Sequence, residues 1–522
     1  MLTFHLLERG TSPPDRAHGQ VYLQIDNWND YSFETFFYVY LFDLRGTRHD
    51  LGGVKIAFKG QTANITTSSV LETTFSSLGE GYFSLGQGTS YYKALSQVPD
   101  AVKNYYLDAL QDLVKKPTLM EKIREERVFG TSLLRSYTIS EIKGKFHRVL
   151  NGEAELTNYT FRYYHSEEDL FGKMDVSFKV EVDAKPNTNI HALIGRNGVG
   201  KTTLLNGIIN TICRPQESKG ILIDEANLVE QPIGSDYFSN LVSVSFSAFD
   251  PFSPPSEQPD PAKGTCYFYI GLKDPQSSDS HRGIQDLLDD CVTALLTCFQ
   301  DEMKTKRWLT AIEGLCSDQN FSSMNLDFLR DQFQQTMQEV RENTGPRYDE
   351  IFREKVIPTL RRMSSGHAIV LLTITRLVAT VTEKTLVLLD EPESHLHAPL
   401  LSAFIRVLSD LLLQQNGVAI IATHSPVVLQ EVPRKCVWKI YRYGKEISFD
   451  RPAIETFGEN VGILTREVFK LEIEKSGFHA LLQKEVDQNH SYNAILEKFD
   501  NQLGLEGRSI LQAMIVNKKN PF

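Results

Sequence analysis

One glycine-rich stretch, set between an apolar run and the start of a helix, constrains this chain more than any other feature. Residues 191–205 read HALIGRNGVGKTTLL, and Gly195, Gly200, Lys201 and Thr202 fit the phosphate-loop pattern G-x-x-x-x-G-K-[ST]. Glycines let the backbone curl so that its N–H groups face phosphate oxygens, and the helix that follows adds its positive N-terminal end. The sequence therefore predicts a nucleotide site at a strand-to-helix turn.

The residues of this loop have separate expected roles. We expect the Lys201 amine to reach the β- and γ-phosphates of ATP, and the Thr202 hydroxyl to hold Mg²⁺. The predicted nucleotide-binding positions in this stretch are Gly195, Asn197, Gly198, Gly200, Lys201, Thr202 and Thr203.

Two later apolar runs complete the expected site. Residues 386–389 predict a buried parallel strand that ends in Asp390 and Glu391. Asp390 is expected to orient the Mg²⁺ shell, and Glu391 to polarise the attacking water. The run 418–422 ends close to His424, which is then placed to contact a γ-phosphate. The predicted catalytic residues are Glu391 and His424, and the predicted metal-binding residues are Thr202 and Asp390.

Each of these pieces, taken alone, also has an ordinary structural explanation. An Asp-Glu pair after an apolar strand can cap a helix, a Ser-Ser-Gly sequence can form a turn, and a lone histidine after a strand is more often structural than catalytic. Their order along the chain favours the functional interpretation, because phosphate loop, Ser-Gly turn, acidic strand end and histidine strand end follow one another in one expected sequence.

In this order of motifs the chain resembles the ABC-type ATPase heads of the SMC, Rad50 and RecF kind. The resemblance implies an α/β fold with a mixed β-sheet lobe and a parallel phosphate-loop core. Residues 284–343 are helical in pattern, and in a hairpin each arm would have about 30 residues, or ~45 Å. Such arms are too short for the long coiled coils of chromosome-structuring ATPases, so we expect a helical insertion and no long coiled coil. The resemblance also implies that a Ser-Gly-Gly signature of one head caps nucleotide held by another, in a head-to-head dimer or a higher oligomer. Ser364, Ser365 and Gly366 occupy the signature positions and are expected to bind nucleotide.

The chain departs from this pattern at two places. Ser365 replaces a glycine of the signature, and His367 replaces the usual glutamine. The glutamine loop is expected near residues 243–250, and that stretch contains no glutamine. Both departures bear on the metal shell and on the rate of hydrolysis.

The chain resembles more closely the PtuA-like ATPases of Septu anti-phage systems, which also occur beside some retrons. The stretches that carry this likeness are 26–30 (DNWND), 129–135 (FGTSLLR), 245–250 (SFSAFD) and 457–469 (FGENVGILTREVF). The resemblance implies an oligomeric ATPase that uses ATP and Mg²⁺ and controls a PtuB-like HNH endonuclease. A retron-linked system adds a reverse transcriptase and its DNA as partners, with any DNA contact of this chain indirect or local.

Composition narrows the class of protein further. The 522 residues are 41% hydrophobic and 23% charged, which is ordinary for a globular protein. The net charge of −11 argues against coating of DNA by the whole surface. The segment 115–148 is locally basic, and a solvated helix face or a contact for nucleic acid or an acidic partner would each explain it. No membrane span, secretory signal or C-x-x-C pair is visible, so we expect a cytoplasmic protein with reduced thiols.

Hydrophobic periodicity divides the chain into six segments. A β-rich lobe with strands near 21–25, 33–42 and 54–58 is expected first, and a helix over 101–114 is expected to end before Pro117. The segments are a β-rich lobe (1–90), a helical segment (91–150), a phosphate-loop lobe (151–250), an irregular proline-rich segment with a helical insertion (251–345), a lobe with the signature, acidic strand and switch histidine (346–462), and a helical tail for docking a partner (463–522).

Several functions use a head of this kind. The leading hypothesis is an ATP-binding and hydrolysing regulatory or assembly subunit of an anti-phage defence complex, which is not itself a nuclease. The alternative is a RecF-like DNA-repair ATPase that binds DNA and loads other proteins. A stand-alone nuclease is disfavoured, because residues 425–522 show no Asp-x-Asp after a strand and His479 and His490 are not set among cysteines. A transporter subunit is disfavoured by the bulky segment before residue 190 and the lack of spans.

Overall fold

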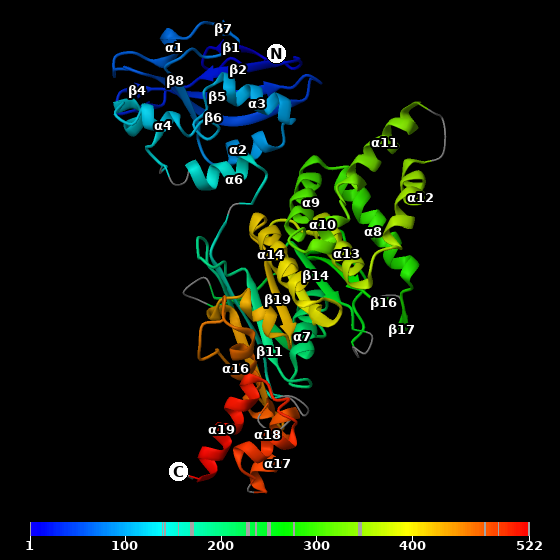
Figure 1. The fold of residues 1–522 in the computed structure, drawn as a ribbon. Coiled ribbons are helices and arrows are strands. Elements are labelled where there is room, and N and C mark those ends of the chain that lie inside the picture. The colour runs from blue at the N-terminus through cyan, green and yellow to red at the C-terminus, as the bar shows by residue number, and fades with distance from the viewer. Residues whose placement is uncertain are drawn as a thin grey trace. The chain divides into compact units, whose positions relative to one another are not determined.

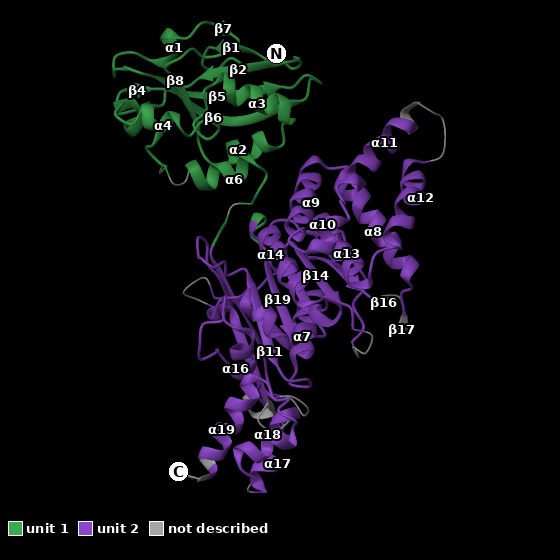
Figure 2. Ribbon diagram, viewed as in Figure 1, with its two compact units in different colours: residues 1–157, 414–416 green, residues 158–413, 417–522 purple. Residues whose placement is uncertain are grey.

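The chain forms two compact units, residues 1–157 with 414–416 (unit 1) and residues 158–413 with 417–522 (unit 2) (Figure 2). The description rests on a computed structural model. It covers residues 2–137, 139, 142–154, 156–167, 172–225, 230–234, 237–247, 252–274, 277–342, 347–473, 477–488 and 490–519. The last three residues of the expected glutamine-loop stretch, 248–250, therefore lie outside the described residues, as does residue 489 beside His490.

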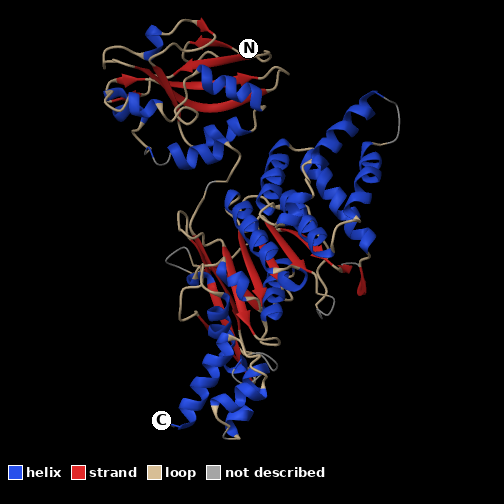
Figure 3. Ribbon diagram, viewed as in Figure 1, coloured by secondary structure: helices blue, strands red, loops and turns tan. Residues whose placement is uncertain are grey.

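Unit 1 is built on a six-stranded sheet with helices packed against it (Figures 1 and 3). In spatial order its strands are β7 (Thr74–Phe75), β1 (Thr3–Leu7), β2 (Gln20–Ile25), β5 (Phe36–Phe42), β6 (Arg48–Phe58) and β8 (Tyr82–Gly86). β5 reads FFYVYLF, and its alternate residues Phe37, Val39 and Leu41 are buried. The strands expected near 21–25 and 54–58 are present, and the run 33–42 divides into β4 (Phe33–Glu34) and β5.

The helical part of unit 1 consists of short pieces. They are α1 (Thr67–Val70), α2 (Thr89–Ser96), α3 (Asp100–Ala109), α4 (Leu119–Lys122), α6 (His147–Leu150) and two π-helical turns, Phe129–Leu133 and Ile142–Phe146. The prediction of one helix over 101–114 was wrong at its end, because α3 stops at Ala109. The buried carboxylate of Asp112 accepts hydrogen bonds from the Tyr92 hydroxyl (3.0 Å) and the Val114 N–H (2.9 Å), which holds a turn there instead.

A buried charge cluster ties the hairpin of β3 (Asn29–Asp30) and β4 to the rest of unit 1. The Asp30 carboxylate lies 2.7 Å from the Lys55 amine and also pairs with Arg135. The Ser132 hydroxyl donates to the same carboxylate at 2.9 Å. Burial raises the pKa of Asp30, but the hydrogen bonds from Lys55, Arg135 and Ser132 outweigh it, so that the pKa lies below its ordinary value. The cluster therefore stabilises unit 1 only while Asp30 is ionised.

Replacement of Asp30 by alanine should destabilise unit 1 strongly, because it leaves the Lys55 ammonium buried without its partner. Breaking a buried pair of this kind typically costs about 3–5 kcal/mol. The control is Asp50→Ala, which removes the exposed partner of Arg48 and should cost about 0–1 kcal/mol. Hydrogen exchange of the β2, β5 and β6 amides measures the free energy of opening of the unit. Equal effects of the two substitutions would contradict the structural role of the cluster.

Unit 2 is centred on a seven-stranded sheet that is parallel except at one edge. In spatial order its strands are β15 (Cys266–Gly271), β14 (Asn240–Ser245), β18 (Leu386–Asp390), β19 (Val418–Thr423), β11 (Ile190–Gly195), β20 (Val437–Tyr443) and the antiparallel β21 (Glu446–Asp450). β11 and β19 are buried along their whole length, as expected for parallel strands covered on both faces. The carboxyl ends of β18, β19 and β11 lie side by side, which is where parallel sheets bind ligands.

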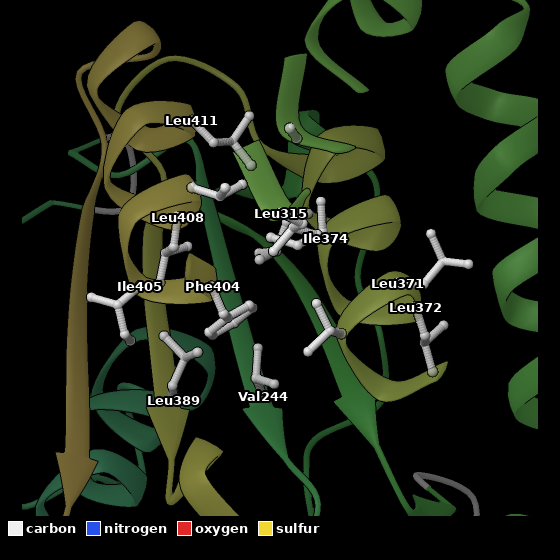
Figure 4. Close-up of a cluster of buried hydrophobic side chains, with 14 of the residues drawn as sticks. Val244, Leu315, Leu371, Leu372, Ile374, Leu389, Phe404, Ile405, Leu408 and Leu411 are labelled. Atoms are coloured by element: carbon white, nitrogen blue, oxygen red, sulfur yellow. The ribbon is translucent and has the colours of Figure 1, made fainter. Parts of the chain in front are cut away.

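Side chains of each strand alternate between two hydrophobic cores. Val387 and Leu389 of β18 face one core, and Leu386 and Leu388 face the other. The helices on the first face are α8 (Ile284–Phe299), α13 (Ser365–Thr380) and α14 (Ala398–Gln414), and Figure 4 shows residues of α13 and α14 packed over Val244 and Leu389. The second face carries α7 (Lys201–Cys213) and the antiparallel sheet of β10 (Met174–Val180), β9 (Tyr159–His165), β12 (Gly220–Asp224) and β13 (Gln231–Pro232). An α/β fold with a parallel core and an antiparallel lobe results.

The segment between β14 and β18 differs from the expectation in detail. Its proline-rich part was predicted to be irregular, yet β15 forms there and pairs with β14 at the sheet edge. β16 (Lys273–Asp274) and β17 (Ser277–His281) follow as a small hairpin. The predicted helical insertion is present, as α8, α9 (Glu302–Leu315), α10 (Gln319–Ser323), α11 (Phe328–Glu342) and α12 (Tyr348–Leu360). These helices are much shorter than two 30-residue arms, and they bury Phe299, Trp308 and Phe352 in the first core.

The described part of the C-terminal segment contains helices, as expected for the tail 463–522. They are α16 (Val461–Ile473), α17 (Gly477–Asp487), α18 (Tyr492–Lys498) and α19 (Leu505–Lys519). Leu482, Val486, Ile495 and Leu511 form a small core of their own there. Among the described helices, none is both long enough and apolar enough to cross a membrane.

Candidate nucleotide site

The phosphate loop turns from β11 into α7, and its glycines are required by its geometry. Gly198 and Gly200 have φ angles of +79° and +105°, in the left-handed region that residues with a side chain rarely adopt. Gly195 fills a different need, because a Cβ there would lie 2.5 Å from the carbonyl oxygen of Ile440 on the neighbouring β20. The loop therefore has the tight curvature that lets backbone N–H groups surround a phosphate.

Lys201 begins α7 with its amine folded back over the loop. Its Nζ donates hydrogen bonds to the carbonyl oxygens of Gly195 (3.0 Å) and Arg196 (3.1 Å). Burial lowers the pKa of this amine, and the nearby carboxylates of Glu391, Asp390 and Glu393 offset that effect only in part. A bound phosphate would add negative charge beside the amine and further favour its protonated form.

Thr202 and Asp390 connect the phosphate loop to the end of β18. The Thr202 hydroxyl donates a hydrogen bond of 2.8 Å to Oδ2 of Asp390. A hydroxyl and a carboxylate oxygen at this separation fit Mg²⁺, which prefers hard oxygen ligands and usually takes only one or two from the protein. These are the two residues that the sequence predicts as metal ligands.

Glu391 sits in a strained conformation directly after the strand. Its φ and ψ angles are 46° and 56°, unusual for a residue with a side chain, and its N–H donates to the Ala422 carbonyl of β19 at 2.8 Å. Its carboxylate lies 3.6 Å from Nδ1 of His424, which follows β19. The structure thus brings together Lys201, Thr202, Asp390, Glu391 and His424 at one end of the sheet, and both predicted catalytic side chains are partly open to solvent.

Glu393 is a part of this arrangement that sequence reasoning missed. Its Oε1 accepts hydrogen bonds from the Thr423 hydroxyl and the His424 N–H, both at 2.7 Å, and lies 3.2 Å from Nδ1 of His424. The side chain is almost fully buried, so it fixes the end of β19 rather than meeting solvent. The sequence shows only a second acidic residue two positions after Glu391. Its hydrogen-bond partners follow from the pairing of β18 with β19, which the sequence alone does not indicate.

The three signature residues lie on a different element, at the start of α13. Ser364 is the N-cap of this 16-residue helix, and both Ser364 and Ser365 are exposed. Gly366 packs against the segment after β18, since a Cβ there would come within 2.5 Å of the His395 carbonyl oxygen. The signature therefore presents two hydroxyls and a helix N-terminus to solvent, a suitable surface for an anion.

A second group of polar side chains, also unforeseen, lies beneath the signature. Asp318, His367 and His397 come from the N-cap of α10, the first turn of α13 and the residue before α14, and their ligand atoms lie within 4.8 Å of one another. One carboxylate and two imidazoles are also a donor set for Zn²⁺. In the sequence, His367 is recognisable only as the residue that replaces the usual glutamine of the signature.

Replacement of Lys201 by alanine should weaken ATP binding by roughly 10²–10⁴-fold, since charged hydrogen bonds to phosphate contribute about 1.5–3 kcal/mol each. The monomer should remain folded, because the amine contacts only the loop in which it lies. Lys179→Ala, at an exposed position on β10, is the control and should leave affinity unchanged. Titration calorimetry measures both. Unchanged affinity in the Lys201 variant would reject this site.

Comparison with known proteins adds three findings. Residues 315–430, from the end of α9 to α15 (Pro426–Gln430), match the family described as "AAA domain, putative AbiEii toxin, Type IV TA system". Over 524 aligned residues the chain is 50% identical to protein ea59 of Escherichia phage lambda, and the match covers 99% of each chain.

The chain is also similar to two solved ATP-binding cassettes of ABC transporters. One, in an ADP conformation, is 12% identical, with 62% of this chain and 100% of that chain covered and a TM-score of 0.34. The other, nucleotide-free, is 14% identical, with 61% and 99% covered and a TM-score of 0.29. The family match over residues 315–430, together with the phosphate loop described above, indicates a nucleotide-binding ATPase domain in unit 2.

Proposed function

This chain belongs to the family of the Escherichia phage lambda protein ea59, and on that premise we propose that it is an ATP-controlled switch. In this proposal two copies close head to head around ATP, and the closed state restrains a partner nuclease of an anti-phage complex. The observation that carries the proposal is the division of the site. One end of the sheet holds the phosphate loop, Asp390, Glu391 and His424, whereas Ser364 and Ser365 face solvent from the start of α13.

The chemistry within one copy follows from the positions of its side chains. Lys201 binds the β- and γ-phosphates. Thr202 and Asp390 would hold Mg²⁺, which when bound would neutralise charge on the phosphates. Glu391, which directly follows β18, accepts a proton from the attacking water. His424 lies between Glu391 and Glu393 and is held so that it can donate to the γ-phosphate.

In the proposed dimer, the second copy supplies the signature. The exposed hydroxyls of Ser364 and Ser365 and the N-terminus of α13 form a complement to a phosphate. The resemblance to ABC-type heads supports their use on the γ-phosphate of the facing copy. A closed dimer then needs ATP, because the nucleotide forms the middle of the interface.

The partner is proposed from the resemblance to PtuA-like ATPases, in which it is an HNH endonuclease. The C-terminal helices offer a place for it, because Leu481 on α17 and Leu505 on α19 are exposed on a part of the chain that has its own small core. A retron reverse transcriptase and its DNA are further proposed partners if the system is retron-linked.

A second candidate is a RecF-like ATPase that binds DNA and loads other proteins. The observation that favours it is the basic segment of unit 1, where Lys122, Arg124 and Lys143 are all exposed. The two functions differ in what they require, since a loader needs hydrolysis for its cycle and a restraining switch needs only bound ATP.

Replacement of Glu391 by glutamine should lower the ATPase rate by about 10²–10⁴-fold while ATP stays bound, because the amide keeps the shape but cannot accept the proton. Glu393→Gln should lower the rate much less, since its Oε1 can still accept the hydrogen bonds from Thr423 and His424. Glu446→Gln, on the exposed β21, is the neutral control. Steady-state hydrolysis and nucleotide retention measure all three.

The same variant tests the proposed direction of control. With the reconstituted complex, DNA cleavage should fall as ATP rises, and Glu391→Gln should silence cleavage at lower ATP than wild type. By linkage, ATP can control the nuclease only through a difference between open and closed heads. Cleavage or DNA loading that requires ATP, and is strongest when hydrolysis is intact, would overturn the switch and favour the loader.

A further inference from the structure

The cluster of Asp318, His367 and His397 lies directly behind the signature serine. Nδ1 of His367 is 2.5 Å from the Ser364 hydroxyl, and its Nε2 is 3.4 Å from Oδ1 of Asp318. The other oxygen, Oδ2, is 3.4 Å from Nε2 of His397. Asp318 and His367 are both buried, whereas Ser364 is exposed. A chain of polar contacts thus runs from a buried carboxylate to the surface of the signature.

The hydrogen bonds around His397 decide against a metal at this cluster. His397 is the N-cap of α14, and its Nδ1 accepts a hydrogen bond from the Leu400 N–H at 3.3 Å. A neutral imidazole has one acceptor nitrogen, so Nε2 of His397 carries the proton, 3.4 Å from Oδ2 of Asp318. An Nε2 that carries a proton cannot bind a metal ion, so the cluster is a hydrogen-bond network.

Asp318 is held in its charged form by the same network. Burial raises the pKa of its carboxyl, but the Phe321 N–H, which donates to Oδ1 at 2.8 Å, and the two histidines outweigh this and lower the pKa. A carboxylate accepts hydrogen bonds only, so the nitrogen of His367 that faces it, Nε2, also carries a proton. Asp318 and His397 are the titratable groups that the packed elements place against His367.

The remaining nitrogen of His367 sets the direction of the Ser364 hydroxyl. When the imidazole is neutral, Nδ1 accepts, and the hydroxyl hydrogen of Ser364 points inward at it. When the imidazole is protonated, Nδ1–H donates to the serine oxygen, and the hydroxyl hydrogen is free to point outward. Phosphate oxygens of ATP only accept hydrogen bonds, so the outward direction is the one that binds them.

We propose that His367 is a positioning residue that aims the Ser364 hydroxyl at the nucleotide of a facing copy, and that closure of two copies over ATP takes up one proton at each His367. This inference rests on the proposed composite site. The usual glutamine at this position has an amide N–H₂ that can donate to the serine at any pH, so the histidine makes the same contact conditional on a proton. The Asp318 carboxylate lies on the far side of the ring, 3.4 Å from Nε2, and supplies a negative charge beside the proton that closure requires.

The sign of the pH dependence follows from linkage. The closed state binds more protons than the open state, so ATP-dependent association strengthens as pH falls and weakens as pH rises through the range in which histidine titrates. One proton per site gives a change in the association constant of up to about tenfold per pH unit for each site.

The test is the association constant of the full chain with saturating ATP and Mg²⁺, measured by analytical ultracentrifugation between about pH 6 and 8.5. Both proteins compared carry Glu391→Gln, so that ATP stays bound. One keeps His367, and the other also carries His367→Gln. Titration of ATP and of the groups that the two proteins share cancels in the comparison. The expected result is a steep fall in association with rising pH for the protein with His367, and a shallower fall for the glutamine variant, which should match it at low pH and exceed it at high pH.

Two further variants connect the effect to the named groups. Asp318→Asn removes the charge but keeps the shape, and should move the fall in association to lower pH. Ser364→Ala should remove the difference between histidine and glutamine, because no hydroxyl is left to direct. ATP binding at the phosphate loop verifies that each variant is folded.

Each outcome has a separate meaning. Equal pH dependence with His367 and with glutamine, or a difference that persists in Ser364→Ala, would overturn this inference and leave the composite site intact. A complete absence of ATP-dependent association at every pH would overturn the composite site and, with it, the role of His367. Association that is lost on chelation of Zn²⁺ and restored by Zn²⁺ would contradict the hydrogen-bond assignment.

Discussion

The hydrogen bond between Thr202 and Asp390 is the contact on which the rest of the site depends. It joins the first turn of α7 to the end of β18, although β18 and β11 are separated in the sheet by β19. The phosphate loop therefore has to cross the carboxyl end of β19 before it reaches its acidic partner. This crossing also sets the positions of Glu391 and His424, because Glu391 follows Asp390 and His424 follows β19.

The same crossing concentrates charge. Asp390, Glu391 and Glu393 surround the buried Lys201 amine, so this end of the sheet carries more negative than positive charge before a ligand binds. Such an arrangement favours nucleotide together with a divalent cation over nucleotide alone, since the cation balances both the carboxylates and the phosphates. The signature side has the opposite character, with neutral hydroxyls and a helix N-terminus. In the proposed dimer, a nucleotide between the two surfaces would make them complementary.

The features of the fold and the site that the sequence predicts are those that a local sequence pattern determines. The phosphate loop, β18 and β19 were recognisable because a buried parallel strand leaves a continuous apolar run and a tight loop needs glycine. β15 was missed because the prolines before it suggested irregular structure, while the run 266–271 pairs at a sheet edge that only the fold creates. Glu393 and Asp318 act through partners about 30 and 49 positions away in sequence, so no spacing rule could indicate them. The N-terminal sheet was expected as a lobe and forms a core of its own, which periodicity alone does not distinguish.

The central claim is that one active site is shared by two copies, and complementation between two inactive variants tests it most directly. Lys201→Ala removes nucleotide binding, and Ser365→Asp places an acid at the exposed signature. Ser365 suits this purpose better than Gly366, where any side chain would collide with the His395 carbonyl of the same chain. Each variant alone should be inactive. Mixed in equal amounts, they should recover about one quarter of the wild-type ATPase rate per chain, because half of randomly formed dimers are mixed and each of these has one intact site of two. A mixture no more active than either variant alone would mean that the site is complete within one chain.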